Sequence, residues 1–172
     1  REGLYRFSWR SRKPQIRLAE TLKIDEFSQP AGGCCFLTDA SYTAKMKDMW
    51  QARGGRSYDL DDIMLLKVGR HLRPVAHFKM IIARDEGETN YLLGYRNRFH
   101  HLVMTSHGGP LTFLEGQLSD DDWSLAAKIS ARFGQGRDAA EVSFLAVTPD
   151  GPEKRLSVAP LKPNQISDTW YL

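Results

Sequence analysis

The stretch from Lys67 to Glu115 constrains the fold most, because short apolar runs and polar turns alternate throughout it. Alternating and β-branched residues predict strands at 70–73, 78–84, 101–105 and 111–114, and a helix from about 86 to 96 lies between the second and third. Asp85, with Glu88 three residues later, predicts a capping box for that helix. Basic residues and glycines recur at the ends of these elements. This pattern favours a surface that binds a phosphate chain, rather than a buried catalytic pocket.

Cap and stop residues locate the other elements. Helices are expected at about 12–23, 40–52 and 120–133, with a short helix after Ser57 or Asp59. Strands are expected at 141–148 and 154–161, joined by the Asp150-Gly151 turn, and a loop-like tail at 163–172. The pattern predicts an α+β protein: a mostly antiparallel sheet with helices on one face, preceded by a short helical segment. The expected domain boundary separates residues 1–56, a linker and helical segment with a Cys-containing loop, from residues 57–172.

Charge is unevenly distributed along the chain. The net charge is +3, but residues 1–77 hold 14 Lys and Arg against 9 Asp and Glu. Residues 78–172 hold 10 against 12. A basic half beside a neutral or acidic half suggests an anionic partner, although an ordinary solvated surface would show the same numbers. The chain begins with Arg1 and has neither a signal peptide nor an apolar run long enough for a membrane helix, so we expect a cytoplasmic fragment or processed chain.

The first 17 residues are basic and aromatic. Tyr5, Phe7 and Trp9 alternate with basic residues, and Arg10, Arg12 and Lys13 follow. Such a segment can neutralise phosphates and stack on bases. It can equally be a solvated arm whose aromatic residues pack on the neighbouring domain, and the sequence leaves both interpretations open.

Two adjacent cysteines, Cys34 and Cys35, lie in Pro30-Ala31-Gly32-Gly33-Cys34-Cys35-Phe36-Leu37-Thr38-Asp39. A thiol close to a helix N-terminus gains thiolate character. A buried pair acting as small apolar side chains is the competing interpretation. Adjacent cysteines close no useful loop, and without a second pair they assemble no zinc site. The five histidines lack metal-ligand spacing, so no metal is expected, and no recognisable ATP-binding loop is present.

The segment from Ala83 to Phe113 resembles the RNA-binding domain called NFACT-R. That domain occurs in ribosome-quality-control proteins and, in a variant form, at the end of certain bacterial tRNA thiolation enzymes. Its Gly-Arg-Asp/Asn motif corresponds to Ala83-Arg84-Asp85, with Ala in place of Gly, and its His-Gly turn to His107-Gly108. Thr89 stands where the family has Asn. The resemblance spans roughly residues 60–162.

Arg10-Ser11-Arg12-Lys13-Pro14-Gln15 and the cysteine segment resemble the part that follows the ATP-pyrophosphatase domain in tRNA-specific 2-thiouridylase-like proteins. Those enzymes adenylate a uridine and deliver sulfur from a cysteine persulfide. The resemblance implies that a cysteine of this segment carries sulfur, with Cys34 as the better candidate and Cys35 as the less favoured one. It also implies that ATP binds in an N-terminal domain absent from this chain, and that a sulfur-donor protein is a partner.

We therefore expect the tRNA-binding C-terminal part of a thiouridylase-like enzyme, inactive on its own and without a cofactor in this chain. Two alternatives stay open: a non-catalytic RNA-binding module with structural cysteines, and a protein-interaction domain. The residues expected to contact RNA are Arg10, Arg12, Lys13, Lys67, Arg70, His71, Arg73, Lys79, Arg84 and His107.

Overall fold

The computed structural model describes residues 12–26, 36, 39–149 and 151–172, and its contacts divide the chain into two compact units, residues 1–36 and 37–172. The sequence predicted a boundary after residue 56 instead. Helix α2 (Ala40–Ala52) belongs to the second unit, because its Tyr42 and Met49 pack with Leu66, which follows helix α3 (Leu60–Leu65).

The described part of the first unit contains helix α1 (Lys13–Thr21). Pro14 lies in its first turn, where the missing N–H costs no hydrogen bond. The Thr21 hydroxyl donates to the Arg17 carbonyl at 2.8 Å, and Lys23 adopts a positive φ of 54° just after the helix. The short helical segment expected before the sheet is therefore confirmed.

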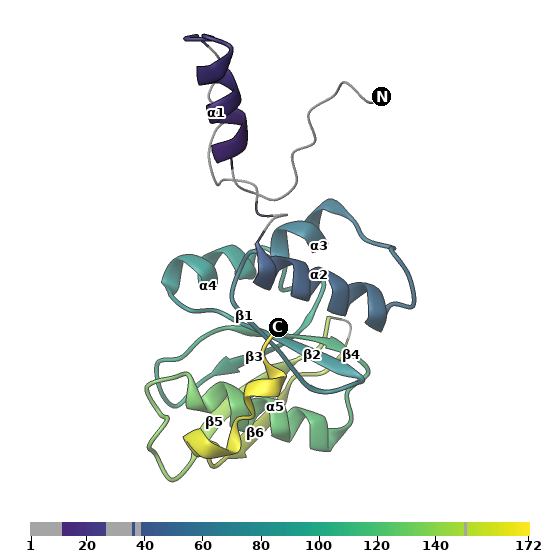
Figure 1. Ribbon diagram of the computed structural model, residues 1–172. Coiled ribbons are helices and arrows are strands. Elements are labelled where there is room, and N and C mark those ends of the chain that lie inside the picture. The colour runs from purple at the N-terminus through teal and green to yellow at the C-terminus, as the bar shows by residue number, and fades with distance from the viewer. Residues whose placement is uncertain (1–11, 27–35, 37–38, 150) are drawn as a thin grey trace. The chain divides into compact units, whose positions relative to one another are not determined.

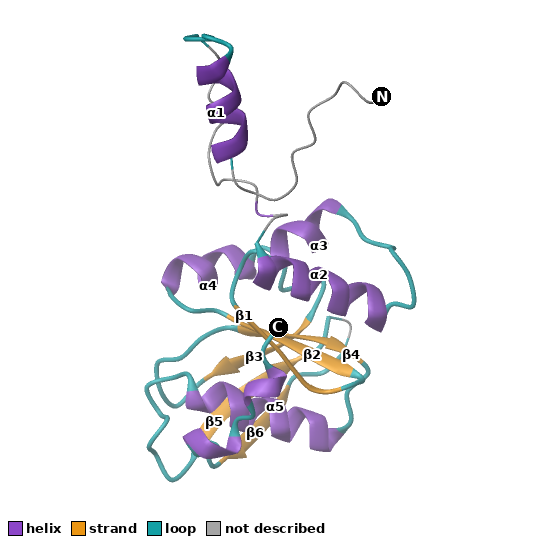
Figure 2. Cartoon of the chain, in the orientation of Figure 1, coloured by secondary structure: helices purple, strands orange, loops and turns teal. Residues whose placement is uncertain are grey.

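The second unit is built on a six-stranded sheet with the order β1-β2-β4-β3-β5-β6. All neighbouring strands pair antiparallel (Figures 1 and 2). These pairings confirm the predicted α+β class and antiparallel sheet. The strands are β1 (Arg70–Val75), β2 (Phe78–Ile82), β3 (His100–Met104), β4 (Thr112–Gly116), β5 (Val142–Val147) and β6 (Lys154–Val158).

Helices cover both faces of the sheet, whereas the sequence predicted one. Helix α5 (Asp120–Arg132) packs on one face, and α2, α3 and α4 (Glu86–Leu93) lie on the other (Figure 1). The cause is visible in β2, where every residue is buried. Phe78, Met80 and Ile82 point into the α5 core, while Ile81 points into the cluster formed with Leu92 of α4. A strand apolar on both sides needs cover on both sides.

Helix α5 begins as its cap residues predict. The Ser119 side chain accepts a hydrogen bond from the Asp122 amide, and the Asp122 carboxylate accepts one from the Ser119 amide, which completes a capping box. Ala126, Ala127 and Ile129 are fully buried against the sheet. Burial of a side chain such as Ile129 contributes roughly 1.5–3 kcal/mol, so this packing is a main source of stability.

The tail folds back onto β1. Two short 3-10 turns, Pro163–Gln165 and Asp168–Trp170, lead to a bridge between Tyr171 and Leu72. The Leu172 amide then donates to the His71 carbonyl at 3.1 Å. The C-terminal residues therefore pair with one edge of the sheet, although the sequence predicted only a loop there.

Candidate nucleic-acid interface

An open groove of about 800 Å³ lies where helix α4 begins and where the loops after β3 and α5 meet. It contains both segments that resemble the NFACT-R motifs, Ala83-Arg84-Asp85 and the glycine turn after His107. Its lining residues are Ala83, Arg84, Asp85, Glu86, Thr89, Gly108, Gly109, Pro110, Phe133, Gly134, Gln135 and Arg137.

The first wall is the beginning of α4. Asp85 Oδ1 accepts from the Glu88 amide at 2.9 Å, which is half of the predicted capping box. The other half is displaced by one residue, because Glu88 Oε2 accepts from the amide of Arg84 at 2.7 Å. Glu88 Oε1 also accepts from Arg84 Nε at 2.8 Å. Glu88 therefore holds Arg84 at the rim of the groove and neutralises much of its charge.

The second wall is made of glycine backbone. A Cβ atom on Gly109 or on Gly134 would lie 2.5 Å from Cε of Met104, which is buried beneath the loops. The Gln135 amide donates to the Gly108 carbonyl at 2.8 Å, which ties the two loops together. Any larger residue would have to displace this packing, so the close approach of the two loops requires glycine at these positions.

Two arginines bring positive charge to the groove. The Arg70 guanidinium lies 5.2 Å above the ring of Phe133, a lining residue, and within the described part of the chain it has no carboxylate partner. The Arg137 side chain is 62% exposed, and its Nε lies 3.6 Å from Oδ2 of the exposed Asp138. Because neither charge is strongly compensated, both are available to an anionic ligand.

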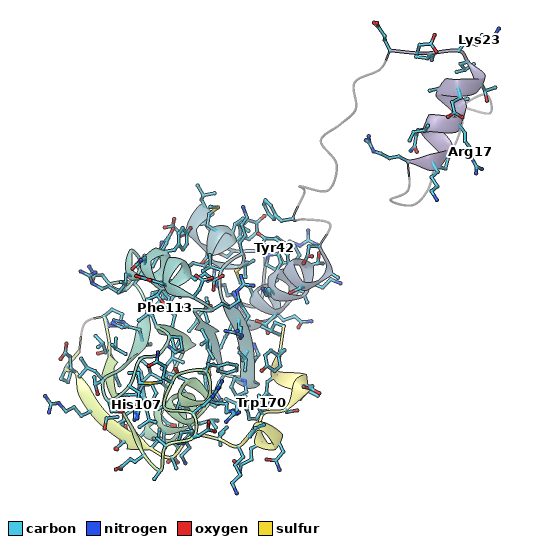
Figure 3. The ribbon with its side chains drawn as sticks, turned by 90° about the vertical axis from the view of Figure 1, so that its left-hand side faces the viewer. Arg17, Lys23, Tyr42, His107, Phe113 and Trp170 are labelled. Carbon is cyan, nitrogen blue, oxygen red and sulfur yellow. The ribbon has the colours of Figure 1, made fainter. Side chains whose placement is uncertain are left out.

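Three of the residues predicted to contact RNA lie at or beside this groove. Arg84 lines it, Arg70 stacks on a residue that lines it, and His107 is exposed on the loop whose glycines form the second wall. His107 Nδ1 lies 2.8 Å from Ser106 Oγ. In Figure 3, His107 lies away from Tyr42 of α2, which places the groove loops apart from the α2 and α3 helices.

Two predicted RNA contacts are buried instead, and for them the prediction needs correction. His71 is 1% exposed, and burial lowers its pKa well below 6.5 while Nε2 lies 2.9 Å from the Val68 carbonyl oxygen. Lys79 is 2% exposed beneath α2, and burial lowers its pKa to about 8 against the opposing attraction of Glu115 and Asp48. Because helices cover both faces of β1 and β2, neither side chain can reach a phosphate in this structure.

Arg73 and Lys67 are also placed outside the groove. Arg73 forms a two-pronged ion pair with Asp48 of α2, with Nη2 at 2.8 Å from Oδ2, and donates to the Ala76 carbonyl at 3.0 Å. Lys67 is exposed after α3, and its Nζ lies 3.7 Å from Met64 Sδ. Arg73 therefore joins α2 to the sheet rather than presenting a free charge.

The remaining predicted residues belong to the first unit. Arg12 and Lys13 are exposed at the start of α1. Arg10, Cys34 and Cys35 lie outside the described residues, so the interpretation of Cys34 as a sulfur-carrying thiol stays a prediction.

The sequence alone missed Arg137, Phe133 and Gln135. They follow the end of α5 in Phe133-Gly134-Gln135-Gly136-Arg137, where a glycine-rich turn ends in a basic residue. That combination is a signal for anion binding, but only the fold brings it beside Arg84, about fifty residues earlier in the chain. Among residues 12–26, 36, 39–149 and 151–172 no group of His, Cys, Asp and Glu is arranged to hold a metal ion. No helix in the same ranges is long and apolar enough to span a bilayer.

Comparison with known proteins places this arrangement in a family. Residues 69–171 match the model of the NFACT protein RNA binding domain. The fold is also similar to the solved C-terminal structure of the fibronectin/fibrinogen-binding protein from Streptococcus suis, with a TM-score of 0.50 and 15% identity over 61% of this chain. This chain covers 49% of that structure. No curated protein matches. The match over 69–171 covers all six strands, α4, α5 and the groove, and the chain therefore belongs to the NFACT RNA-binding domain family.

Proposed function

We propose that the groove binds the sugar-phosphate backbone of a structured RNA, and specifically of tRNA. The observation that carries this proposal is the pair Arg70 and Arg137 beside the glycine loops. Within the described chain Arg70 has no carboxylate partner, and Arg137 has only the exposed Asp138 at 3.6 Å. Gly108, Gly109 and Gly134 bring main-chain atoms to the lining of the groove, where a phosphate would meet them.

Such a groove contacts backbone rather than base edges. Guanidinium groups and main-chain amides bind phosphate oxygens, and these contacts position an RNA without reading its sequence. Arg84 keeps its bond to Glu88 and forms the rim, while Arg70 is held in place by the Phe133 ring. The proposal therefore predicts binding that depends on the shape of the RNA and weakens with salt.

The test is a titration of tRNA into the 172-residue chain at about 50 and about 200 mM salt. If several phosphates are contacted, affinity falls by orders of magnitude between these salts. Arg70→Ala and Arg137→Ala should each reduce the slope of log affinity against log salt by about one. Lys47→Ala, which removes an exposed charge from α2, is the matched control. Equal effects of all three variants, or no binding at low salt, would contradict the proposal.

For the parent protein we propose a tRNA thiouridylase-like enzyme in the cytoplasm, in which this chain is the C-terminal RNA-binding part. The proposal is supported by Gly33-Cys34-Cys35-Phe36-Leu37, which resembles the catalytic cysteine segment of those enzymes. Cys34 would carry sulfur received from a donor protein, and ATP would be used by an N-terminal domain. A non-catalytic RNA-binding module fits the family match equally well, and replacement of Cys34 distinguishes the two.

A further inference from the structure

The outer face of β3, β5 and β6 is open, unlike the rest of the sheet. Along β5 the burial alternates: Phe144 and Ala146 pack inward against α5, while Leu145 and Val147 point the other way and are half-buried. Val103, which pairs with Leu145, is 38% exposed in the middle of β3. Helices α2, α3 and α4 pack instead over β1, β2 and β4. An apolar strip therefore remains without cover from the described residues.

This strip forms the floor of a trough. Two adjoining hollows of about 690 and about 320 Å³ share Leu145 and Glu153 and run across the three strands. Arg155 lines the larger hollow, and Arg96 and Asn97 line the smaller one. Their combined size falls in the range of small-ligand sites.

The charged side chains of the trough are not engaged within the described chain. Arg96, Arg155 and Glu153 form no ion pair with another described residue. Arg73 and Arg84, by contrast, form ion pairs with Asp48 and Glu88. Uncommitted guanidinium groups beside an apolar floor match a ligand with both an anionic part and a flat apolar part.

The loop after β3 contributes residues to both the trough and the groove. Ser106 lines the trough and Gly108 lines the groove, so a single loop separates the two. The Ser143 amide of β5 donates to Ser106 Oγ at 3.0 Å, which fixes this loop to the edge of the trough. An RNA strand that leaves the groove over the loop meets the trough next.

We propose that the trough binds one or two unpaired nucleotides of the same RNA, with bases on Val103, Leu145 and Val147 and phosphates at Arg155 and Arg96. Glu153 accepts hydrogen bonds from base N–H donors, since unpaired RNA exposes its base edges to side chains. The inference rests on the proposed binding of RNA in the groove and adds a preference for an RNA with a single-stranded extension.

The test compares one RNA hairpin in blunt form with the same hairpin carrying a four-nucleotide extension, each titrated into the 172-residue chain. The extension should increase affinity several-fold, because it adds phosphate contacts to Arg155 and Arg96 and buries apolar base surface on the floor. Arg155→Ala should lower the affinity for the extended hairpin several-fold and leave the affinity for the blunt hairpin unchanged. Val103→Glu, a change at an already exposed position, should remove most of it.

Lys154→Ala is the matched control, because Lys154 neighbours Arg155 on β6 but pairs with Asp120 of α5 at 2.6 Å. An extension that adds no affinity, or equal losses of affinity in the Lys154 and Arg155 variants, would overturn the proposal that the trough binds RNA. Neither result would contradict the proposed binding of RNA in the groove. If neither hairpin binds at low salt, the proposed function of the groove fails as well. If Arg155→Ala weakens both hairpins equally, Arg155 belongs to general charge attraction and the trough proposal is overturned.

Discussion

The guanidinium of Arg70 lies 5.2 Å above the ring of Phe133, and this contact connects the first residue of β1 to the residue that follows α5. It fixes a cation at the groove without using a carboxylate, so the charge is positioned and still available. The groove thereby differs from the sheet beneath α2, where Arg73 and Arg53 are held by acidic partners.

Replacing the ring that supports Arg70 should weaken RNA binding. Phe133→Leu keeps an apolar side chain against the α5 core but removes the π face. A cation–π contact at an exposed site contributes about 0.5–1 kcal/mol, so affinity for tRNA at low salt should fall about two- to fivefold. Phe99→Leu is the control, because Arg98 lies 5.8 Å above that ring outside the groove. An equal loss in both variants would contradict the special role of Arg70.

Removing Arg73 should reduce stability and leave RNA binding intact. Arg73→Met leaves Asp48, whose side chain is 11% exposed, without its cation. Breaking such a pair should lower the free energy of unfolding by about 2–4 kcal/mol. Urea unfolding measures this change, and Lys47→Met on the exposed side of α2 should change stability by less than about 0.5 kcal/mol. A several-fold loss of tRNA affinity with unchanged stability would instead restore Arg73 as an RNA contact.

The buried Lys79 predicts a stability that rises in alkali. Burial lowers its pKa from 10.5 to about 8, so between these pH values the unfolded chain binds more protons than the folded protein. Stability therefore increases as pH rises from about 8 to about 10.5, and below pH 8 the folded protein carries the full cost of a buried charge. The fall in pKa corresponds to roughly 3 kcal/mol.

Lys79→Met removes that cost, so the variant should be more stable than the wild type at pH 7 by up to roughly 3 kcal/mol. The advantage should shrink as pH approaches 10.5. Urea unfolding at pH 7 and at pH 9.5 checks both statements, with Lys47→Met as the exposed control. A variant that is less stable at pH 7, or a difference that does not change with pH, would contradict this account.

The sequence predicts most of the elements because their signals are local. Asp59 and Asp85 cap the helices that they were expected to cap, and Asp39 and Ser119 cap α2 and α5, each through a side chain that accepts a backbone N–H. Helix caps and strand periodicity depend on neighbours within a few residues, so a single sequence is sufficient for them.

The fate of each basic residue depends on contacts distant in sequence. Arg70 and Arg73 are three residues apart on β1, yet the first stacks on Phe133 and the second pairs with Asp48 of α2. The sequence around Lys79 does not distinguish it from an exposed lysine in a strand, because its burial is caused by α2. The packing of helices on both faces of β2 determines which basic residues are buried or paired. The sequence of β1 or β2 alone does not show which acidic residue will pair with each of them. The groove was for the same reason only half predicted, since Arg137 joins it through the fold.

The thiol hypothesis makes a separate prediction for the parent protein. If Cys34 carries sulfur, Cys34→Ser should abolish formation of thiolated tRNA in the full-length protein and leave tRNA binding by this chain unchanged. Mass spectrometry of digested tRNA measures the modification, and Cys35→Ser is the neighbouring control and should retain activity. Normal thiolation by the Cys34 variant would favour the non-catalytic RNA-binding module.

The most direct measurement of the central claim is a map of the backbone amides that respond when tRNA binds. In ¹⁵N-labelled chain at low salt, the account predicts that the amides of Gly108, Gly109, Gly134 and Gln135 shift first and most, and that Arg137→Ala reduces these shifts. Amides of α2 near Lys79 and Arg73 should remain unchanged. Shifts confined to α2 and α3, with the glycine loops silent, would contradict the assignment of the groove as the RNA-binding site.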